Sequence, residues 1–143
     1  MKNYLLLATV LTGCLVPMLA VLAAWVKRTE QREEMPLPRS WRLGLLDVAT
    51  GEYRKKDFYA ALVLGRGNGP EPDGVLFLAR DYTVSRQQCR LSAVGDSVWI
   101  ENLSQVNETV LNGVPLAVPR ELHRGDSILM GRREFQVTFL ERR

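Results

Sequence analysis

The sequence predicts an all-β domain that follows one N-terminal membrane-spanning helix. An uncharged apolar run opens the chain, apolar residues then recur with a period of two, and turns rich in glycine or proline separate the alternating stretches. With 143 residues, 46% hydrophobic and 24% charged, the chain has the composition of a globular protein. We therefore divide it into a transmembrane anchor over residues 1–26, a polar linker over 27–40 and a β-sandwich domain over 41–143.

The anchor prediction depends on residues 4–26, which contain no charged side chain. A helix rises about 1.5 Å per residue, so one of this length crosses a hydrocarbon core of roughly 30 Å. Tyr4 and Trp25 lie near its two ends, where aromatic rings favour the membrane interface. Pro17 lies in the middle, where a membrane helix tolerates it. We expect residues 4–26 to lie in the lipid bilayer.

Two other interpretations of this segment stay open. A cleaved signal peptide has an apolar core of only about 7 to 15 residues, which is shorter than this run. The letters "LTGC", residues 11–14, resemble the lipobox of bacterial lipoproteins, with Cys14 as the lipidated residue. The apolar run continues to Val26, however, whereas a lipoprotein turns polar after its cysteine. A membrane span agrees better with the length.

Basic residues on either side of the span predict its orientation. Lys2 precedes it, and four basic residues follow within a short distance: Lys27, Arg28, Arg32 and Arg39. The flank richer in lysine and arginine stays in the cytoplasm. The expected location is therefore the cell membrane, with a single pass and the folded domain in the cytoplasm. The linker is polar and carries Pro36 and Pro38.

The folded domain shows its strands as alternating apolar residues. In chain order these are Trp41, Leu43 and Leu45 before Gly51, Leu62 and Leu64 before "GRGNG", Cys89, Leu91 and Ala93 before Gly95-Asp96, Val98 and Ile100 after it, and Phe135, Val137 and Phe139. The Gly-Asp pair predicts a hairpin. In the last strand we expect one apolar face, with Gln136, Thr138 and Leu140 on the opposite face. Many short strands without a helical period predict a sandwich or a barrel.

Several classes of function are disfavoured by composition and motifs. The net charge is only +3 and no lysine-rich tract occurs, so we expect no nucleic-acid partner. Cys14 and Cys89 lack a second pair for a metal site, and a low cysteine count fits a reducing compartment. His123 lies in a polar turn without a nucleophile nearby. The "GRGNG" stretch lacks the ending of a nucleotide loop. We predict no enzyme activity, cofactor, metal or small-molecule substrate.

Five separated fragments together carry a resemblance to a known family. They are "LGRG" at 64–67, "VSRQQC" at 84–89, "NLSQVNETVLNG" at 102–113, "LHRGDSILMG" at 122–131 and "EFQVTFL" at 134–140. In order and spacing this set resembles the forkhead-associated (FHA) domain, over about residues 41–140. The resemblance implies a β-sandwich of about eleven strands that binds phosphothreonine peptides through loops at one end.

The resemblance also implies roles for individual residues. Arg66 would be the main phosphate clamp, Ser85 would donate its hydroxyl to a phosphate oxygen, and Arg86 would add positive potential at the rim. Asn107 would bond the peptide main chain. A phosphate carries about −1.5 to −2 charges and several acceptor oxygens, which an arginine fork and a hydroxyl satisfy together. The remaining motif residues would be structural: Gly65, Gln88, Thr109, Asn112, Gly113, Gly125 and Asp126.

Three positions depart from the family pattern. Gln88 replaces a histidine that braces the binding loops, which puts loop rigidity in question, although an amide still donates and accepts hydrogen bonds. Val106 stands at a phosphopeptide-binding position where many relatives carry threonine or serine, so one donor is lost. Glu108 replaces a glycine and adds a negative charge.

The sequence therefore predicts a membrane-anchored adaptor that binds a phosphothreonine-containing protein or peptide downstream of a Ser/Thr kinase. One alternative is a degenerate FHA domain that binds a partner without phosphate. Another is an extracytoplasmic lipoprotein β-domain, which the "LTGC" motif and the two N-x-[ST] acceptors at Asn102 and Asn107 would favour. A domain held in the cytoplasm never meets the glycosylation machinery, so under the preferred orientation these acceptors are accidental.

Overall fold

A computed structural model describes residues 20, 21, 23 and 39–143, and the first three of these are helical. Most of the predicted anchor, 1–26, and of the linker, 27–40, lies outside the described residues, as does Cys14. Among the residues that are described, no helix has the length and apolar character required to cross a membrane.

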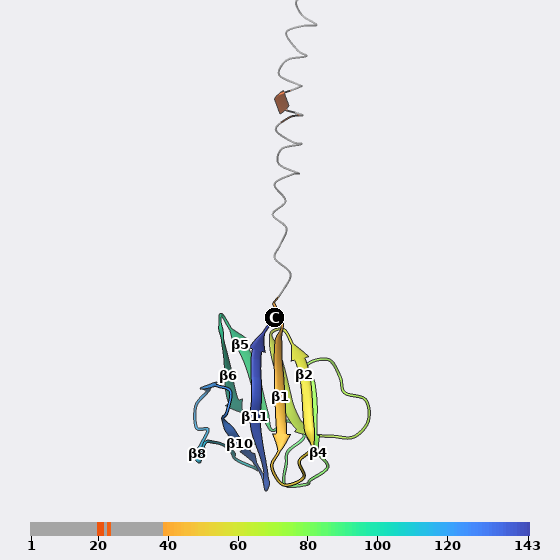
Figure 1. Ribbon diagram of the computed structural model, residues 1–143, viewed down its shortest axis with the longest axis vertical. Coiled ribbons are helices and arrows are strands. Elements are labelled where there is room, and N and C mark those ends of the chain that lie inside the picture. Colours follow the sequence, from red (N-terminus) through yellow and green to blue (C-terminus); the bar gives the residue numbers. More distant parts are fainter. Residues whose placement is uncertain (1–19, 22, 24–38) are drawn as a thin grey trace, which may run out of the picture. The chain divides into compact units, whose positions relative to one another are not determined.

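The folded domain consists of two β-sheets (Figure 1). Its eleven strands are β1 (Trp41–Asp47), β2 (Tyr53–Phe58), β3 (Ala61–Arg66), β4 (Val75–Ala79), β5 (Cys89–Val94), β6 (Ser97–Asn102), β7 (Thr109–Leu111), β8 (Val114–Pro115), β9 (Arg120–Leu122), β10 (Ser127–Met130) and β11 (Arg133–Arg142). One sheet has the order β2-β1-β11-β10-β7-β8 and the other β4-β3-β5-β6-β9. All described strand pairs are antiparallel except β3 with β4, which is parallel. The predicted all-β sandwich of about eleven strands is confirmed.

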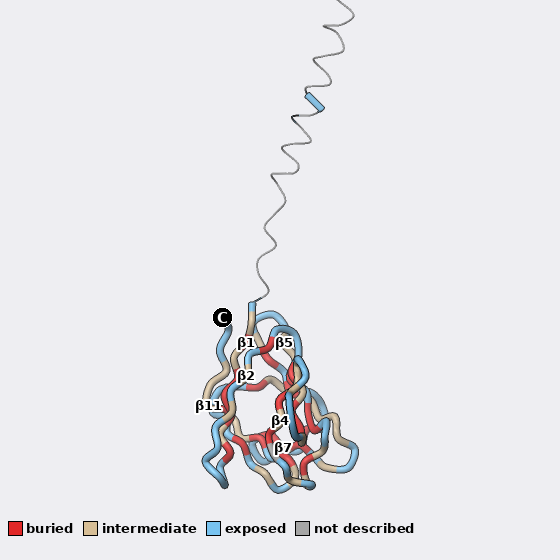
Figure 2. The backbone as a smooth tube through the Cα atoms, turned by 90° about the vertical axis from the view of Figure 1, so that its right-hand side faces the viewer, coloured by how far each residue is buried: buried red, intermediate tan, exposed pale blue. Residues whose placement is uncertain are grey.

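The hydrophobic core lies between the two sheets, where Figure 2 shows the buried segments facing one another. Leu43 and Leu45 of β1 are completely buried, as are Leu62 and Leu64 of β3, so the predicted alternation is correct in both strands. The described core residues all belong to the sandwich, which therefore has a complete core of its own. The predicted hairpin at Gly95 is also present, and this glycine adopts a φ of +60° between β5 and β6.

Strand β11 departs from the predicted pattern in its second half. The pairing with β1 skips Thr138, which forms a bulge, and each side chain beyond it faces the opposite side of the sheet. Leu140 consequently packs on the core opposite Leu43, whereas Phe139 lies on the outer face with its ring centroid 6.1 Å from that of Tyr53. The prediction that Phe139 shares the face of the earlier apolar residues was wrong, because the extra residue inverts the period of two.

Different segments of the chain lie at the two ends of the sandwich. At one end the chain enters β1 and leaves β11, and Arg142 pairs with Asp96 of the β5–β6 turn. At the other end lie the loops after β3, β4 and β6, together with the β10–β11 turn. Here the Arg132 N–H donates to Thr83 Oγ1 at 3.0 Å, which ties that turn to the β4–β5 loop. The predicted phosphopeptide-binding residues fall at this second end, opposite the entry of the chain, whereas the β9–β10 turn with Gly125 and Asp126 lies near Trp41 at the first end.

Candidate functional site

Arg66 is the last residue of β3 and is held at the surface by three contacts. Its backbone N–H donates to Ser85 O at 3.0 Å, and its Nε donates to Val84 O at 3.0 Å. The guanidinium lies over the ring of Tyr82, 4.9 Å from the centroid. Its two terminal nitrogens have no acceptor among the described residues. The main chain and the aromatic ring therefore orient the guanidinium and leave its fork available for an anion.

Ser85 and Asn107 come together beside Arg66, although they are 22 residues apart in the chain. The side-chain Nδ2 of Asn107 donates to Ser85 Oγ at 3.1 Å. Because the carbonyl of Ser85 also accepts from the backbone of Arg66, these three predicted site residues form one continuous cluster at the loop end. Arg86, the fourth, is exposed at its edge.

Ser104 belongs to the same cluster and was missed by the sequence reasoning. Its Oγ accepts the backbone N–H of Asn107 at 2.9 Å and that of Val106 at 3.3 Å, and it lies 2.6 Å from Ser85 Oγ. A serine two or three residues before the N–H groups that it binds is a turn signal that could have been found. Ser104 thus shapes the β6–β7 loop and connects it to the β4–β5 loop.

Gln88 fastens both of these loops from below. Its side chain is completely buried, with Oε1 accepting the Ser85 N–H at 2.9 Å and Nε2 donating to Asn107 O and to Thr109 Oγ1, each at 3.0 Å. Its main-chain oxygen also accepts the N–H groups of Leu103 and Ser104. The side-chain amide uses both its oxygen and its nitrogen, so glutamine braces the loops despite the departure from the family pattern.

Thr109 completes this buried network. It is 1% exposed, and its hydroxyl donates to Asn102 Oδ1 at 2.9 Å. Asn102 in turn donates through Nδ2 to Ser104 O at 2.8 Å. Both polar atoms of the Asn102 side chain are therefore engaged within the domain, and Thr109 holds the base of the β6–β7 loop.

Gly65 is required by close packing and not by a turn. A Cβ at this position would lie 1.9 Å from the carbonyl oxygen of Arg86, because the β4–β5 loop crosses directly over β3. Gly65 lies within β3 and its φ is not positive, so its structural role does not depend on left-handed backbone geometry. The absent side chain brings the Ser85 main chain within hydrogen-bonding distance of Arg66.

The other predicted structural residues form the turns at β7–β8 and β9–β10. Gly113 and Gly125 adopt φ values of +81° and +89°, which a glycine accommodates without strain. Asn112, with a φ of +49°, donates through Nδ2 to Asp126 Oδ1 at 2.9 Å and accepts the Ser127 N–H at 2.9 Å. These residues support the fold and lie apart from the Arg66 cluster.

The tip of the β6–β7 loop is open to solvent. Val106 is 88% exposed, and Glu108 is exposed as well. A hydroxyl at the position of Val106 would be free to reach a ligand, whereas the valine offers an apolar surface.

The β4–β5 loop has an internal brace of its own. Asp81 Oδ1 accepts both the backbone N–H of Thr83 at 2.8 Å and its hydroxyl at 2.7 Å. These hydrogen bonds hold the pKa of Asp81 below its usual value. The turn positions Tyr82, the ring on which Arg66 rests.

His123 and Cys89 belong to residue types that often serve in catalysis, and neither is part of the Arg66 cluster. His123 is in the β9–β10 turn with 64% of its side chain exposed, as the polar turn predicted. Cys89 is completely buried, and this burial raises the pKa of its thiol to about 12. Within residues 39–143 and the short helical stretch, no group of three or more histidine, cysteine, aspartate or glutamate side chains could hold a metal ion.

Residues 62–131 match the family model of the FHA domain. Over these residues the folded part of this chain is similar to an FHA domain. The match contains the whole Arg66–Ser85–Asn107 cluster and the Gln88 brace. FHA domains are protein–protein interaction modules and not enzymes. No curated protein matches the sequence.

Solved structures of FHA domains share this fold. One, from a structural and functional analysis of phosphothreonine-dependent FHA domain interactions, is 26% identical, with a TM-score of 0.54 over 68% of this chain and 94% of that one. The FhaA FHA domain is 24% identical, with a TM-score of 0.51 over 69% and 98% of the two chains. Mycobacterium tuberculosis EmbR, in complex with a low affinity phosphopeptide, is 22% identical, with a TM-score of 0.52 over 84% of this chain and 30% of its own. The last two likenesses show the fold alone.

Proposed function

We propose that this chain is a membrane-anchored adaptor whose FHA domain binds phosphothreonine peptides and recruits phosphorylated partners in Ser/Thr kinase signalling. The observation that carries the proposal is the convergence of Arg66, Ser85 and Asn107 at one end of the sandwich. One similar FHA domain was studied for its phosphothreonine-dependent interactions, and EmbR was solved in complex with a low affinity phosphopeptide.

The hydrogen bonds around Ser85 support its role as a phosphate donor. Ser104 Oγ accepts two backbone N–H groups, which occupy both its lone pairs, so its own hydrogen is directed at Ser85 Oγ. Ser85 Oγ therefore accepts from Ser104 and from Asn107, and its own hydroxyl hydrogen stays free. A phosphate oxygen beside the fork of Arg66 would accept that hydrogen. The clamp then offers charge from the arginine and a directed donor from the serine.

The chain path fits recruitment at a membrane. The linker joins the sandwich at Trp41, at the end where Arg142 and Asp96 pair, whereas the clamp lies at the opposite end. A peptide bound at the clamp would leave the entry of the chain unobstructed. In addition, a glycan on Asn102 would attach at Nδ2, the atom that donates to Ser104 O. This hydrogen bond supports a cytoplasmic location, where Asn102 is not glycosylated.

The decisive experiment is a titration of the protein with a phosphothreonine peptide library, with Arg66→Ala and Arg124→Ala as matched variants. Losing the bidentate arginine should weaken binding about 100-fold, since each bond to a charged group contributes about 1.5 to 3 kcal/mol. Arg124 is exposed in the β9–β10 turn, and its loss should have little effect. Binding that survives Arg66→Ala, or no binding to any phosphopeptide, would exclude the phosphate mechanism.

A phosphate-independent interaction module is the second candidate. The exposed Val106 favours it, because this loop tip offers an apolar contact where a hydroxyl donor would serve phosphate. The exposed Glu108 adds negative charge beside the clamp. Under this alternative, unphosphorylated partner peptides would bind as tightly as phosphorylated ones and would tolerate Arg66→Ala.

The membrane orientation has its own test. The proposal places residues 4–26 in the bilayer and Arg143 in the cytoplasm, on the basis of the basic residues that follow the apolar run. A cysteine introduced at position 143 should resist a membrane-impermeant thiol reagent in intact cells and react after lysis. Labelling in intact cells would place the domain outside and favour the extracytoplasmic alternative.

A further inference from the structure

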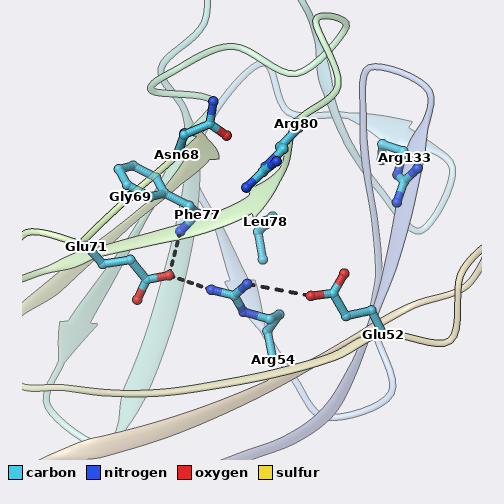
Figure 3. Close-up of a pocket in the computed structure, with 10 residues that line it drawn as sticks. Glu52, Arg54, Asn68, Gly69, Glu71, Phe77, Leu78, Arg80 and Arg133 are labelled. Carbon is cyan, nitrogen blue, oxygen red and sulfur yellow. Dashed lines mark hydrogen bonds and ion pairs between the residues drawn. The ribbon is translucent and has the colours of Figure 1, made fainter.

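A cavity of about 440 Å³ lies at the clamp end of the domain, between β2, the β3–β4 loop, β4 and the start of β11 (Figure 3). Residues from two segments that form the clamp also line this cavity. Gly67, the residue after Arg66, lines it, and so does Arg80, two residues before the Tyr82 ring on which Arg66 rests. A ligand held at Arg66 is therefore within a few residues of this cavity.

Three arginines surround the cavity, and Figure 3 shows the side chains of Arg54, Arg80 and Arg133 around the same space. Two carboxylates, Glu52 and Glu71, also line it. Whether the cavity attracts an anion depends on how much of each charge is already neutralised within the domain.

Glu71 is neutralised. Its oxygens accept from Arg54 Nη2 at 2.6 Å, from Lys56 Nζ at 3.0 Å and from the Phe77 N–H at 3.1 Å. Burial favours the protonated form, but these hydrogen bonds outweigh it and hold the pKa of Glu71 below its usual value. The carboxylate is thus ionised and shared between two cations, so it cannot repel a further anion strongly.

The arginines, by contrast, retain unused donors. Arg80 is exposed and has no acceptor among the described residues. Arg133 pairs with the buried carboxylate of Asp47 through Nη2, but its Nε is buried without a partner. Glu52 lies 3.6 Å from Arg54 with 58% of its side chain exposed, so it forms a loose pair at the rim. The balance of charge around the cavity is therefore positive and favours an anion.

The glycine-rich stretch "GRGNG" forms one wall of the cavity, through Gly67, Asn68 and Gly69. A Cβ on Gly67 would lie 2.4 Å from the ring of Phe77, so the loop main chain packs directly on that ring. Glu71 fastens the loop to β2 and β4 a few residues later. The wall is therefore held in place by packing and ion pairs before any ligand arrives.

From these contacts we propose that the cavity is a second anion site, which takes an acidic or phosphorylated side chain of the same peptide that the clamp binds. This inference rests on the proposed function. Carboxylate and phosphate oxygens share the chemistry that Arg80 and its neighbours supply. An extended peptide advances about 3.3 Å per residue, so about five residues on either side of the phosphothreonine cover roughly 16 Å of the surface around Arg66.

The test compares peptide affinities with the full-length protein in detergent micelles. One peptide carries phosphothreonine with neutral flanks, and the others place a glutamate or a phosphoserine at each position within about five residues on either side. We expect at least one position to bind about threefold to tenfold tighter than the neutral peptide. That ratio should fall to near one in Arg80→Gln and persist in Arg124→Gln, which removes the same charge from the turn beside Trp41 at the other end.

The outcomes separate the two proposals. If the neutral phosphopeptide binds through Arg66 but no acidic position adds affinity, or if the gain survives Arg80→Gln, the second site is wrong and the adaptor proposal stands. If wild-type protein binds no phosphothreonine peptide, both fail. A gain with phosphoserine alone identifies a doubly phosphorylated partner, and a gain with glutamate as well identifies an acidic segment.

Discussion

Replacement of Gln88 by methionine tests whether the buried amide holds the binding loops together. Methionine has a similar length and fills the same volume, but it neither donates nor accepts the hydrogen bonds in question. The substitution leaves the Ser85 N–H and the Asn107 carbonyl without their described partners, whereas Thr109 keeps its bond to Asn102. The single substitution therefore removes the hydrogen bonds of two main-chain groups in two different loops.

The magnitude follows from these two groups. A buried donor or acceptor left unsatisfied costs about 1 to 3 kcal/mol, and Ser85 and Asn107 are half-buried, so water offsets part of the loss. We expect Gln88→Met to lower the free energy of unfolding by about 2 to 4 kcal/mol. A domain of this size has a total of about 5 to 15 kcal/mol, so the urea midpoint should fall by about 1 to 2 M.

The assay is urea denaturation combined with phosphopeptide titration, and Gln87→Met is the matched control. Gln87 precedes Gln88 but is exposed, so its replacement should change neither quantity by much. Phosphopeptide affinity should fall in Gln88→Met even where the domain remains folded, because Ser85 and Asn107 lose their common support. A midpoint within about 0.3 M of wild type would refute the bracing role.

Three further predictions concern single positions. Gly65→Ala should cost about 2 to 3 kcal/mol and weaken phosphopeptide binding, because the new Cβ meets the Arg86 carbonyl; an unchanged melting temperature would contradict this. Burial raises the pKa of Asp47, but the Arg133 ion pair and main-chain N–H groups outweigh it, so the folded pKa lies below the unfolded one and the stabilisation is lost on acidification. Asp47→Asn should flatten the loss of stability between about pH 5 and pH 2, measured by urea midpoints. Val106→Thr should tighten phosphothreonine binding about tenfold by adding a donor at the exposed loop tip, and equal affinities would show that this position does not touch phosphate.

Local patterns in the sequence were sufficient for five of the eleven strands, namely β1, β3, β5, β6 and β11. Alternation at Leu43 and Leu45, or at Leu62 and Leu64, reports which residues face a core, because side chains in a strand alternate whatever the partner strand is. The same rule failed after Thr138, since a bulge depends on how β1 pairs with β11 and leaves no mark in the residues themselves. The anchor over residues 1–26 remains a prediction.

The candidate site divides in the same way. The separated motifs, through their resemblance to the FHA domain, indicated Arg66, Ser85 and Asn107 as candidate site residues. They did not indicate that Ser104 contacts Ser85, nor that Gln88 hydrogen-bonds both binding loops. These hydrogen bonds join residues 19 to 21 positions apart. Hydrogen-bond partners across that separation depend on where two loops meet.

The sequence by itself therefore determined the class of fold and the position of five strands, since periodicity and turn chemistry are properties of neighbouring residues. The candidate phosphate-binding residues came from the resemblance of the separated motifs to the FHA domain. Only the tertiary structure decided why Gly65 is a glycine, which face Phe139 occupies and that Arg54, Arg80 and Arg133 surround one cavity. Each of these depends on the approach of segments distant in the chain. Packing and electrostatics act between residues that are close in space, and these residues come together only when the sheets pair.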